Sequence, residues 1–238
     1  MDTLQFLSML SAYVILNPKH LLFHADCTPQ GKYFDLISRL PSFRYVITEA
    51  PTKVHNRPVK LPAHQADVLR LRILREYGGI YLDDTEIVTR PFDELMKYDV
   101  SLPFEKNGTY QNGVIVSRPE AAFIRRWYLY GYKDFDDKRW GWNSCIQPYN
   151  LNTQYPGKLN VVDAFMPTWD QYNVLWDKND KTYTDKGGFP WRELGNYAVH
   201  IYNKKSKKPV KDNLHEILKA EHTVGELARF VVDKVFSK

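Results

Sequence analysis

The sequence predicts an α/β protein with a mostly parallel central sheet. In its first half, short apolar runs alternate with segments whose apolar residues recur every three or four positions, the order that builds such sheets. Glycine and proline stand between these segments, where turns are expected. The chain has 238 residues, of which 43% are hydrophobic and 14% aromatic, so it can bury a sizeable core.

Three helices, each followed by a strand, are expected in this first half. The first helix carries Leu4, Leu7, Leu10 and Val14 on one face and ends before Pro18. Gly78 follows the third helix, where a left-handed cap belongs. The helices are expected over residues 4–16, 34–40 and 64–77, and the strands over 20–26, 44–50 and 79–84.

The second half is less regular, and loops rich in Trp, Tyr, Asp and Pro are expected over residues 133–196. Asp212 and Thr223 are the expected N-caps of two final helices. The pattern also indicates strands over 112–119 and 196–203, a helix over 120–132 and a lysine-rich run over 204–211.

Composition narrows the class of protein without selecting a partner. The net charge of +5 and pI of about 9.0 fit an anionic partner such as a nucleotide, a nucleic acid or a phospholipid surface. Two cysteines make no disulfide framework, which favours a reducing compartment. The most apolar N-terminal run, residues 4–16, is too short to span a bilayer and lacks the features of a signal peptide, so a soluble, cytoplasmic protein is expected.

An acidic group, Asp83, Asp84, Thr85 and Glu86, follows the third strand. Ligands of open α/β sheets gather beyond the carboxyl ends of strands, and a row of hard oxygen atoms suits Mg²⁺ or Mn²⁺. A polar turn that merely ends a strand is the alternative.

The segment "QADVLRLRILREYGGIYLDDTEIVTRPFDEL" resembles the DXD segment of a family of sugar-nucleotide glycosyltransferases. This group includes the yeast initiating mannosyltransferases, the animal α1,4-galactosyltransferase and, more distantly, the glucosylating domains of clostridial toxins. The likeness extends over roughly residues 4–206, through "FLSMLSAYVILNPKHLLFHADCTPQGKYFDLI", "QNGVIVSRPEAAFIRRW", "WGWNSC" and "NYAVHIYNKKS".

The resemblance implies a GT-A fold over residues 1–211, with residues 212–238 as a C-terminal helical extension. It implies transfer of a hexose-type sugar, with retention, from a nucleotide diphosphate sugar, UDP being the commonest carrier, to a glycan or glycoprotein acceptor. A Mn²⁺ or Mg²⁺ ion would bridge the DXD acid and the diphosphate. The family's first strand is missing here, and no transmembrane anchor is seen, which suits a cytosolic or viral enzyme or a Golgi enzyme whose anchor has been removed.

Several residues match the family's metal and diphosphate positions. Asp83 matches the first acid of DXD and Thr85 the second, with Asp84 or Glu86 as alternative carboxylates. His200 matches a late histidine that approaches the metal or the diphosphate in related enzymes. Asn203, Lys204 and Lys205 follow it as candidate diphosphate contacts, although a lysine run is also an ordinary solvated surface.

Other residues match positions near the donor sugar. Asp67 and Arg70 lie at i and i+3 on one helix face, as either a clamp on sugar hydroxyls or a plain ion pair, and Tyr81 belongs to the same donor side. Glu105 and Asn112 are the candidate catalytic residues. The set Trp140, Trp142, Trp169 and Trp176 contains candidates for the acceptor groove, and Asn143 is a weaker candidate.

Three alternatives remain open from the sequence. Glu105, Asp136 or Asp137 could act as the base of an inverting enzyme. A degenerate sugar-nucleotide-binding protein is the non-enzymatic alternative, because Thr85 replaces an acid. A nucleic-acid binder is disfavoured because acidic residues are scattered among the basic ones.

Overall fold

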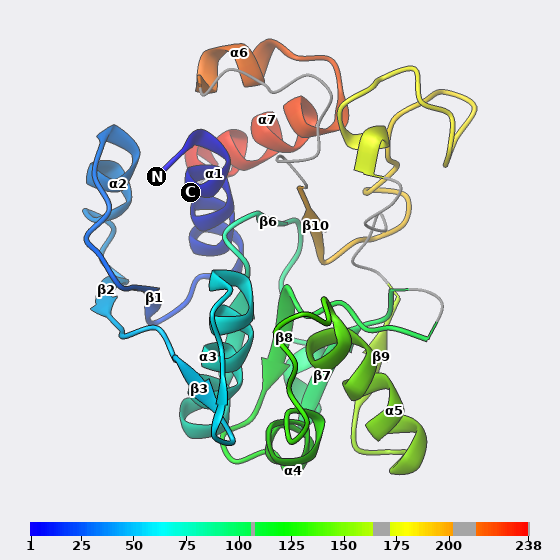
Figure 1. The fold of residues 1–238 in the computed structure, drawn as a ribbon. Helices are drawn as coiled ribbons and strands as arrows, with labels where there is room; N and C mark the ends of the chain where they lie inside the picture. Colours follow the sequence, from blue (N-terminus) through cyan, green and yellow to red (C-terminus); the bar gives the residue numbers. More distant parts are fainter. Residues whose placement is uncertain (106–107, 164–171, 202–212, 238) are drawn as a thin grey trace. The chain divides into compact units, whose positions relative to one another are not determined.

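The structure is a computed structural model that describes residues 1–105, 108–163, 172–201 and 213–237 (Figure 1). It confirms the α/β class. The chain divides into two compact units, described separately below: the first unit comprises residues 1–47, 84–91 and 164–238, and the second unit comprises residues 48–83 and 92–163.

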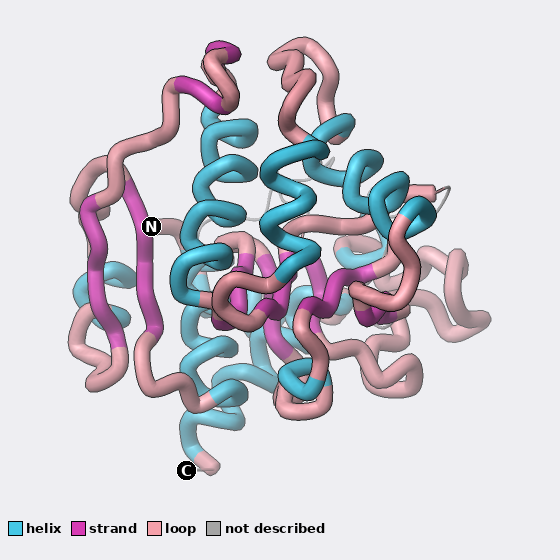
Figure 2. The backbone as a smooth tube through the Cα atoms, turned by 90° about the horizontal axis from the view of Figure 1, so that it is seen from below, coloured by secondary structure: helices cyan, strands magenta, loops and turns pink. Residues whose placement is uncertain are grey.

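The N-terminal part of the first unit follows the sequence pattern closely. The Asp2 carboxylate accepts a hydrogen bond from the Gln5 amide, and the Gln5 side chain bonds back to Asp2, so the first helix begins with a capping box. Figure 2 shows the first two strands as an adjacent pair, and they are parallel. The elements are α1 (Thr3–Ser11), η1 (Ala12–Leu16), β1 (Leu21–Ala25), α2 (Lys32–Ile37) and β2 (Phe43–Ile47).

The C-terminal part of the first unit pairs β6 with β10, packs α7 onto α1 and packs α6 onto α7. Val224, Leu227 and Val231 share a buried core with Leu7. His222, not Thr223, caps the last helix, because its Nδ1 accepts the Gly225 amide hydrogen bond. The elements are β6 (Glu86–Val88), η5 (Tyr172–Leu175), β10 (Ala198–His200), α6 (Leu214–Lys219) and α7 (Thr223–Phe236).

Asn213 caps α6, since its side chain accepts a hydrogen bond from the His215 amide. Asp212, the cap expected from the sequence, lies outside the described residues, as does the expected division at residue 211. That division stays a prediction.

The second unit holds a four-stranded sheet in the order β5-β8-β7-β9. Its strands are β5 (Gly79–Leu82), β7 (Val100–Pro103), β8 (Val114–Ser117) and β9 (Asn160–Val162), and a separate antiparallel pair is β3 (Lys53–Val54) with β4 (Arg57–Pro58). The helical elements are α3 (Pro62–Tyr77), η2 (Leu95–Lys97), α4 (Ala122–Arg126), η3 (Trp127–Gly131), η4 (Trp142–Ile146) and α5 (Gln147–Gln154).

The expectation of a mostly parallel sheet is wrong for this unit. Strand β8 runs antiparallel to both β5 and β7, and only β7 with β9 is parallel. The chain returns from β7 to β8 through a connection with no helix among its described residues, and a direct return of this kind gives antiparallel strands. Apolar runs identify strands but carry no information on their direction.

Helix α3 supports the site described below. Pro62 occupies its first turn, and Val68, Leu71 and Leu74 form its buried face against the core of the second unit. Gly78 ends it with φ of 65°, and a Cβ there would lie 2.5 Å from the Pro119 nitrogen. Only glycine fits this turn, so the chain passes directly from α3 into β5.

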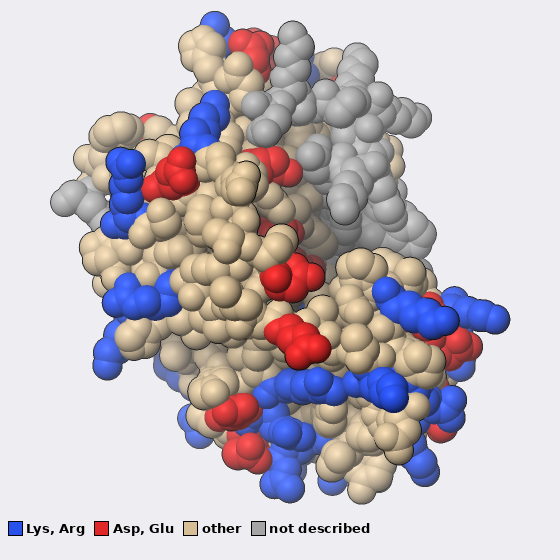
Figure 3. All heavy atoms as spheres, turned by 60° about the vertical axis from the view of Figure 1, so that its left-hand side comes forward, with Lys and Arg blue, Asp and Glu red and all other residues tan. Residues whose placement is uncertain are grey.

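Within the described ranges, no helix is long and apolar enough to cross a membrane. Acidic side chains stand among basic ones on the face that Figure 3 presents. The positive net charge is therefore not concentrated on one uniformly basic surface there.

Candidate active site

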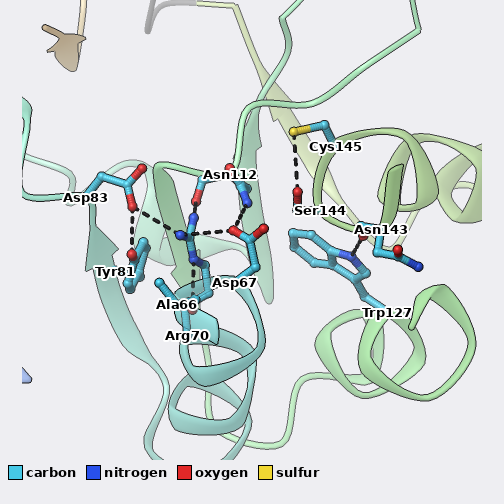
Figure 4. Close-up of polar contacts among 10 residues, drawn as sticks. All are labelled: Ala66, Asp67, Arg70, Tyr81, Asp83, Asn112, Trp127, Asn143, Ser144 and Cys145. Atoms are coloured by element: carbon cyan, nitrogen blue, oxygen red, sulfur yellow. Dashed lines mark hydrogen bonds and ion pairs between the residues drawn. The ribbon is translucent and has the colours of Figure 1, made fainter. Parts of the chain in front are cut away.

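The candidate site centres on Arg70, whose side chain is 5% exposed on α3. Its guanidinium forms ion pairs with Asp67 at 3.0 Å and with Asp83 at 3.2 Å, and it donates to the backbone oxygen of Asn112 at 2.6 Å (Figure 4). Four residues predicted from the sequence therefore meet within the second unit. Since Asp67 and Arg70 are three residues apart on a helix, one face presents both.

Asp83 reaches this cluster because β5 ends at Leu82. The Asp83 amide donates to the Gly113 oxygen at 2.7 Å, which continues the pairing of β5 with β8 by one residue. The Tyr81 hydroxyl donates to Asp83 Oδ1 at 2.6 Å, and the Arg70 guanidinium lies 4.4 Å above the Tyr81 ring. Tyr81 therefore fixes both charged groups.

Asn112, two residues before β8, joins the cluster through two contacts. Its side-chain nitrogen donates to Asp67 Oδ1 at 2.7 Å, while its backbone oxygen accepts from Arg70. The Asn112 side chain orients the Asp67 carboxylate while Arg70 holds the Asn112 backbone, so the arrangement is rigid. A rigid polar arrangement suits recognition of a hydroxyl-rich ligand. The tight-turn interpretation of Asn112-Gly113 does not account for these contacts.

Burial controls the electrostatics of the cluster. It raises the pKa of Asp67, although the attraction of Arg70 opposes this rise. Burial lowers the pKa of Arg70, but the attraction of the Asp83 and Asp67 carboxylates outweighs it, so the pKa is raised and the guanidinium stays charged. Burial also raises the pKa of Tyr81 well above its usual value, which keeps its hydroxyl protonated as a donor.

The cluster thus holds two carboxylates, Asp67 and Asp83, and one guanidinium. When both acids are ionised, its charge is negative in a largely desolvated place, so the residues fit an additional cation. Among the described residues, no group of three or more His, Cys, Asp or Glu side chains could hold a metal by itself. Mg²⁺ usually takes further ligands from substrate phosphates and water.

The border between the two units falls between Asp83 and Asp84. In the first unit, exposed Asp84 accepts a hydrogen bond from Gln5 at 2.5 Å, and the Thr85 oxygen accepts from the Ile201 amide at 2.9 Å. Both residues form the turn after β5, so strict strand alternation no longer assigns them to opposite faces. Their roles as metal ligands stay predictions.

His200 lies opposite Glu86 in the β10–β6 pair of the first unit. Its Nδ1 is 3.4 Å from the fully buried Glu86 carboxylate, an arrangement that orients the imidazole ring. The predicted metal role of His200 is untested by these contacts. Asn203, Lys204 and Lys205 lie outside the described residues.

Glu105 follows β7 in the second unit and accepts a hydrogen bond from the Thr109 hydroxyl at 3.2 Å. Its catalytic role stays a prediction. Ser144 and Cys145, which sequence reasoning did not single out, lie beside Asp67 in the site: hydrogen bonding from Ser144 lowers the pKa of Asp67, and burial raises the pKa of Cys145 to about 12. Cys145 is therefore a thiol, not a nucleophilic thiolate.

The sequence also did not reveal the pair of His64 and Asp137. The His64 Nδ1 atom lies 3.0 Å from the Asp137 Oδ1 atom. Asp137, one of the candidate bases for inversion, is thus bound to a histidine. The signal available in the sequence was spacing alone: His64, Asp67 and Arg70 recur every three residues along one helix.

The tryptophans separate by environment. Trp140 is 75% exposed, whereas Trp142 lies beneath the Arg139 guanidinium at 3.5 Å, and Trp176 packs on the core of the first unit. Trp169 lies outside the described residues. Of the four candidates for the acceptor groove, Trp140 presents the most open ring among those described.

A buried cluster of acid, guanidinium and amide at the carboxyl end of a strand defines a class of polar-ligand site that α/β proteins use for nucleotides and sugars. Comparison with known proteins gives the class more narrowly. Residues 16–102 match the family described as "Glycosyltransferase sugar-binding region containing DXD motif". This match contains Asp67, Arg70, Tyr81 and Asp83.

A related protein is Glucan organizing enzyme 1 of Cryptococcus neoformans var. grubii, which is 32% identical over 223 residues. The alignment covers 87% of this chain, and the chain spans 60% of the length of that relative.

Two solved structures also show a partial likeness. PaToxG glycosyltransferase is 12% identical with a TM-score of 0.47, over 66% of this chain and 65% of that one. An active-site mutant of LgtC is 15% identical with a TM-score of 0.46, over 99% of this chain and 93% of that one.

The resemblance to DXD-motif glycosyltransferases is therefore confirmed over residues 16–102. Because the chain spans 60% of the length of its relative, the activity of the whole protein is a proposal. The donor, the acceptor and the course of the reaction are proposals.

Proposed function

We propose that the protein transfers a hexose-type sugar from a nucleotide diphosphate sugar, with UDP as the expected nucleotide, to a glycan acceptor. The reaction is expected to need Mn²⁺ or Mg²⁺ and to retain the anomeric configuration. The observation that supports this proposal is the buried cluster of Asp67, Arg70, Asp83 and Asn112 inside the second unit, three of whose members lie in the matched region. Its relative's printed name refers to glucan, so a glucan is one acceptor class to test.

In this proposal, Asp67 and Asn112 bind hydroxyl groups of the donor sugar. The Asp67 carboxylate accepts hydrogen bonds, and the Asn112 amide can donate or accept, so together they distinguish hydroxyl positions. Arg70 keeps both oriented because it holds the Asp67 carboxylate and the Asn112 backbone at once. Such preorganisation limits the reorganisation that the reaction requires.

Asp83 is the residue that would hold the metal, together with diphosphate oxygens of the donor. When bound, a divalent cation neutralises the charge that develops on the diphosphate leaving group. The Tyr81 hydroxyl and Arg70 fix the Asp83 carboxylate, so that its position is set before the donor arrives. His200, Asp84 and Thr85 stay predictions from the sequence as further metal and diphosphate contacts.

The test is a panel of UDP- and GDP-sugars, each with Mn²⁺, Mg²⁺ or EDTA, with release of the nucleotide as the readout. The proposal expects metal-dependent release with at least one donor. Asp83→Ala should abolish it, whereas Asp99→Ala, which removes a carboxylate that is 65% exposed in the same unit, should not. Full release by Asp83→Ala would refute the assignment.

The same panel separates the alternatives. Thermal stabilisation by one donor, without nucleotide release from any, would indicate a sugar-nucleotide-binding protein that does not transfer. For an active donor, NMR of the anomeric proton in the product distinguishes retention from inversion. Inversion would require a base for the acceptor hydroxyl and would direct attention to Glu105, Asp136 and Asp137.

A further inference from the structure

The second unit contains a small hollow beside Asp67, on the row of α3 residues that leads away from Arg70. It is lined by His64, Asp67, Tyr132, Arg139 and Asn143, among other residues. The hollow is small, so a ligand would lie against it and reach its buried polar atoms only with single hydroxyl groups. None of these lining residues except Asp67 has a role in the proposed donor site.

Two buried polar atoms at this hollow have no hydrogen-bond partner among the described residues: the Tyr132 hydroxyl and Asn143 Oδ1. Tyr132 is 1% exposed and Asn143 is 4% exposed. The rest of Asn143 is fixed, because its side-chain nitrogen donates to the Gly131 oxygen at 2.6 Å and its backbone oxygen accepts from Trp127 at 2.8 Å. Buried polar atoms are normally paired, so this place fits a ligand that brings hydroxyl groups.

Trp140 does not line the hollow itself but lies against His64, which does. Trp140 is 75% exposed, and its ring lies 5.4 Å from the buried His64 ring, centroid to centroid. Asp137 engages His64 Nδ1, so Nε2 is the other polar atom of that ring. An open aromatic face beside fixed polar groups is an arrangement that suits a sugar ring, which is apolar on its faces and polar at its edge.

The order of residues along α3 places this hollow relative to the donor site. His64, Asp67 and Arg70 are three residues apart in turn, and a helix rises about 4.5 Å over three residues. Arg70 and Asp83 form the diphosphate end in the proposed function, and Asp67 binds the donor sugar. The next position along the row, at His64, is then where the acceptor of that sugar would lie.

We propose that the acceptor glycan binds over this hollow, with one sugar ring stacked on Trp140 and with hydroxyls bonded to Tyr132 and Asn143. This inference rests on the proposed function. Tyr132, Asn143 and Trp140 are specificity residues in this view, and His64 is a positioning residue held by Asp137.

The first test is Trp140→Ala, with Tyr130→Ala as the matched control because Tyr130 is 64% exposed in the same unit. Loss of a stacking partner should raise the acceptor KM about tenfold, the change that follows from removing one favourable aromatic contact. Trp140→Phe should restore most of the affinity. Donor hydrolysis without acceptor should be unchanged in all three variants.

The second test is Tyr132→Phe, which removes only the unpartnered hydroxyl. Because that hydroxyl is buried without a partner among the described residues, the free variant should resist urea at least as well as the parent chain. The acceptor KM should nevertheless rise severalfold. A purely structural role predicts no change in KM, and that result would overturn the inference.

The probes are α- and β-linked gluco-oligosaccharides and manno-oligosaccharides, whose binding to the whole chain is also measured directly by calorimetry. This measurement does not depend on transfer: if no donor releases nucleotide, the proposed function fails, while weaker oligosaccharide binding by Trp140→Ala would still support the site. No oligosaccharide binding, or binding equal in parent and both variants, would overturn it. A rise in donor KM with unchanged acceptor KM would overturn it too, by assigning the hollow to the donor instead.

Discussion

Replacing Arg70 by methionine should destabilise the protein by about 3–5 kcal/mol, the usual cost of leaving a buried charge without its partner. The side chain is 5% exposed and makes ion pairs with Asp67 and Asp83 and a hydrogen bond to Asn112. Methionine fills a similar volume, so the loss measures charge and hydrogen bonding more than packing. For a chain of this length the change corresponds to a drop in Tm of roughly 6–20 °C.

The loss should depend on pH with a defined sign. The attraction of Arg70 holds down the pKa of Asp67, so its removal raises that pKa further above the unfolded value. A carboxyl with a raised folded-state pKa favours folding at low pH, and this contribution is lost as pH rises through the folded-state pKa. The deficit of Arg70→Met should therefore be larger at pH 7 than at pH 5.

The assay is urea unfolding followed by tryptophan fluorescence at both pH values. Arg125→Met is the matched control, because it removes an ion pair of 3.8 Å whose arginine is 58% exposed, and it should cost under about 1 kcal/mol. Arg70→Lys keeps the charge but loses the planar guanidinium that reaches several acceptors. Its loss of stability should therefore lie between those of Arg70→Met and Arg125→Met. Equal losses for Arg70→Met and Arg125→Met, or a deficit independent of pH, would refute the reasoning.

Three further predictions concern single residues. Asp67→Asn removes a carboxylate whose pKa is raised by burial, so stability in urea at pH 7 should stay level or increase, and any gain should fade on acidification. Nucleotide release should nevertheless fall about a hundredfold. If stability and nucleotide release fell in parallel, that result would argue against a binding role. Gly78→Ala should cost about 2–4 kcal/mol in thermal unfolding, and Gly157→Ala, at φ of 81° in open space, about 1 kcal/mol. Iodoacetamide at pH 8 should modify exposed Cys27 in the folded protein and Cys145, with a pKa of about 12, only after unfolding, as mass spectrometry would show.

Local features of the sequence were sufficient to indicate which of these residues share one side of the candidate site. The helix that carries Asp67 and Arg70, its stop at Gly78 and the strand before Asp83 all follow from spacing and turn chemistry within a few residues. The resemblance to DXD-motif glycosyltransferases then supplied the roles. The same reasoning could not give the direction of β8, because an apolar run reads the same in parallel and antiparallel sheets.

Tertiary structure alone decided which distant residues meet. Asn112 bonds to Asp67 across 45 positions, and His64 pairs with Asp137 across 73. Nothing in the local pattern of either segment indicates these partners, because side-chain contacts over such distances depend on how the whole unit packs. The sequence by itself thus determined the α/β class and the acids of the candidate site, while folding decided the partners that fix those acids and brought together the residues that line the polar hollow.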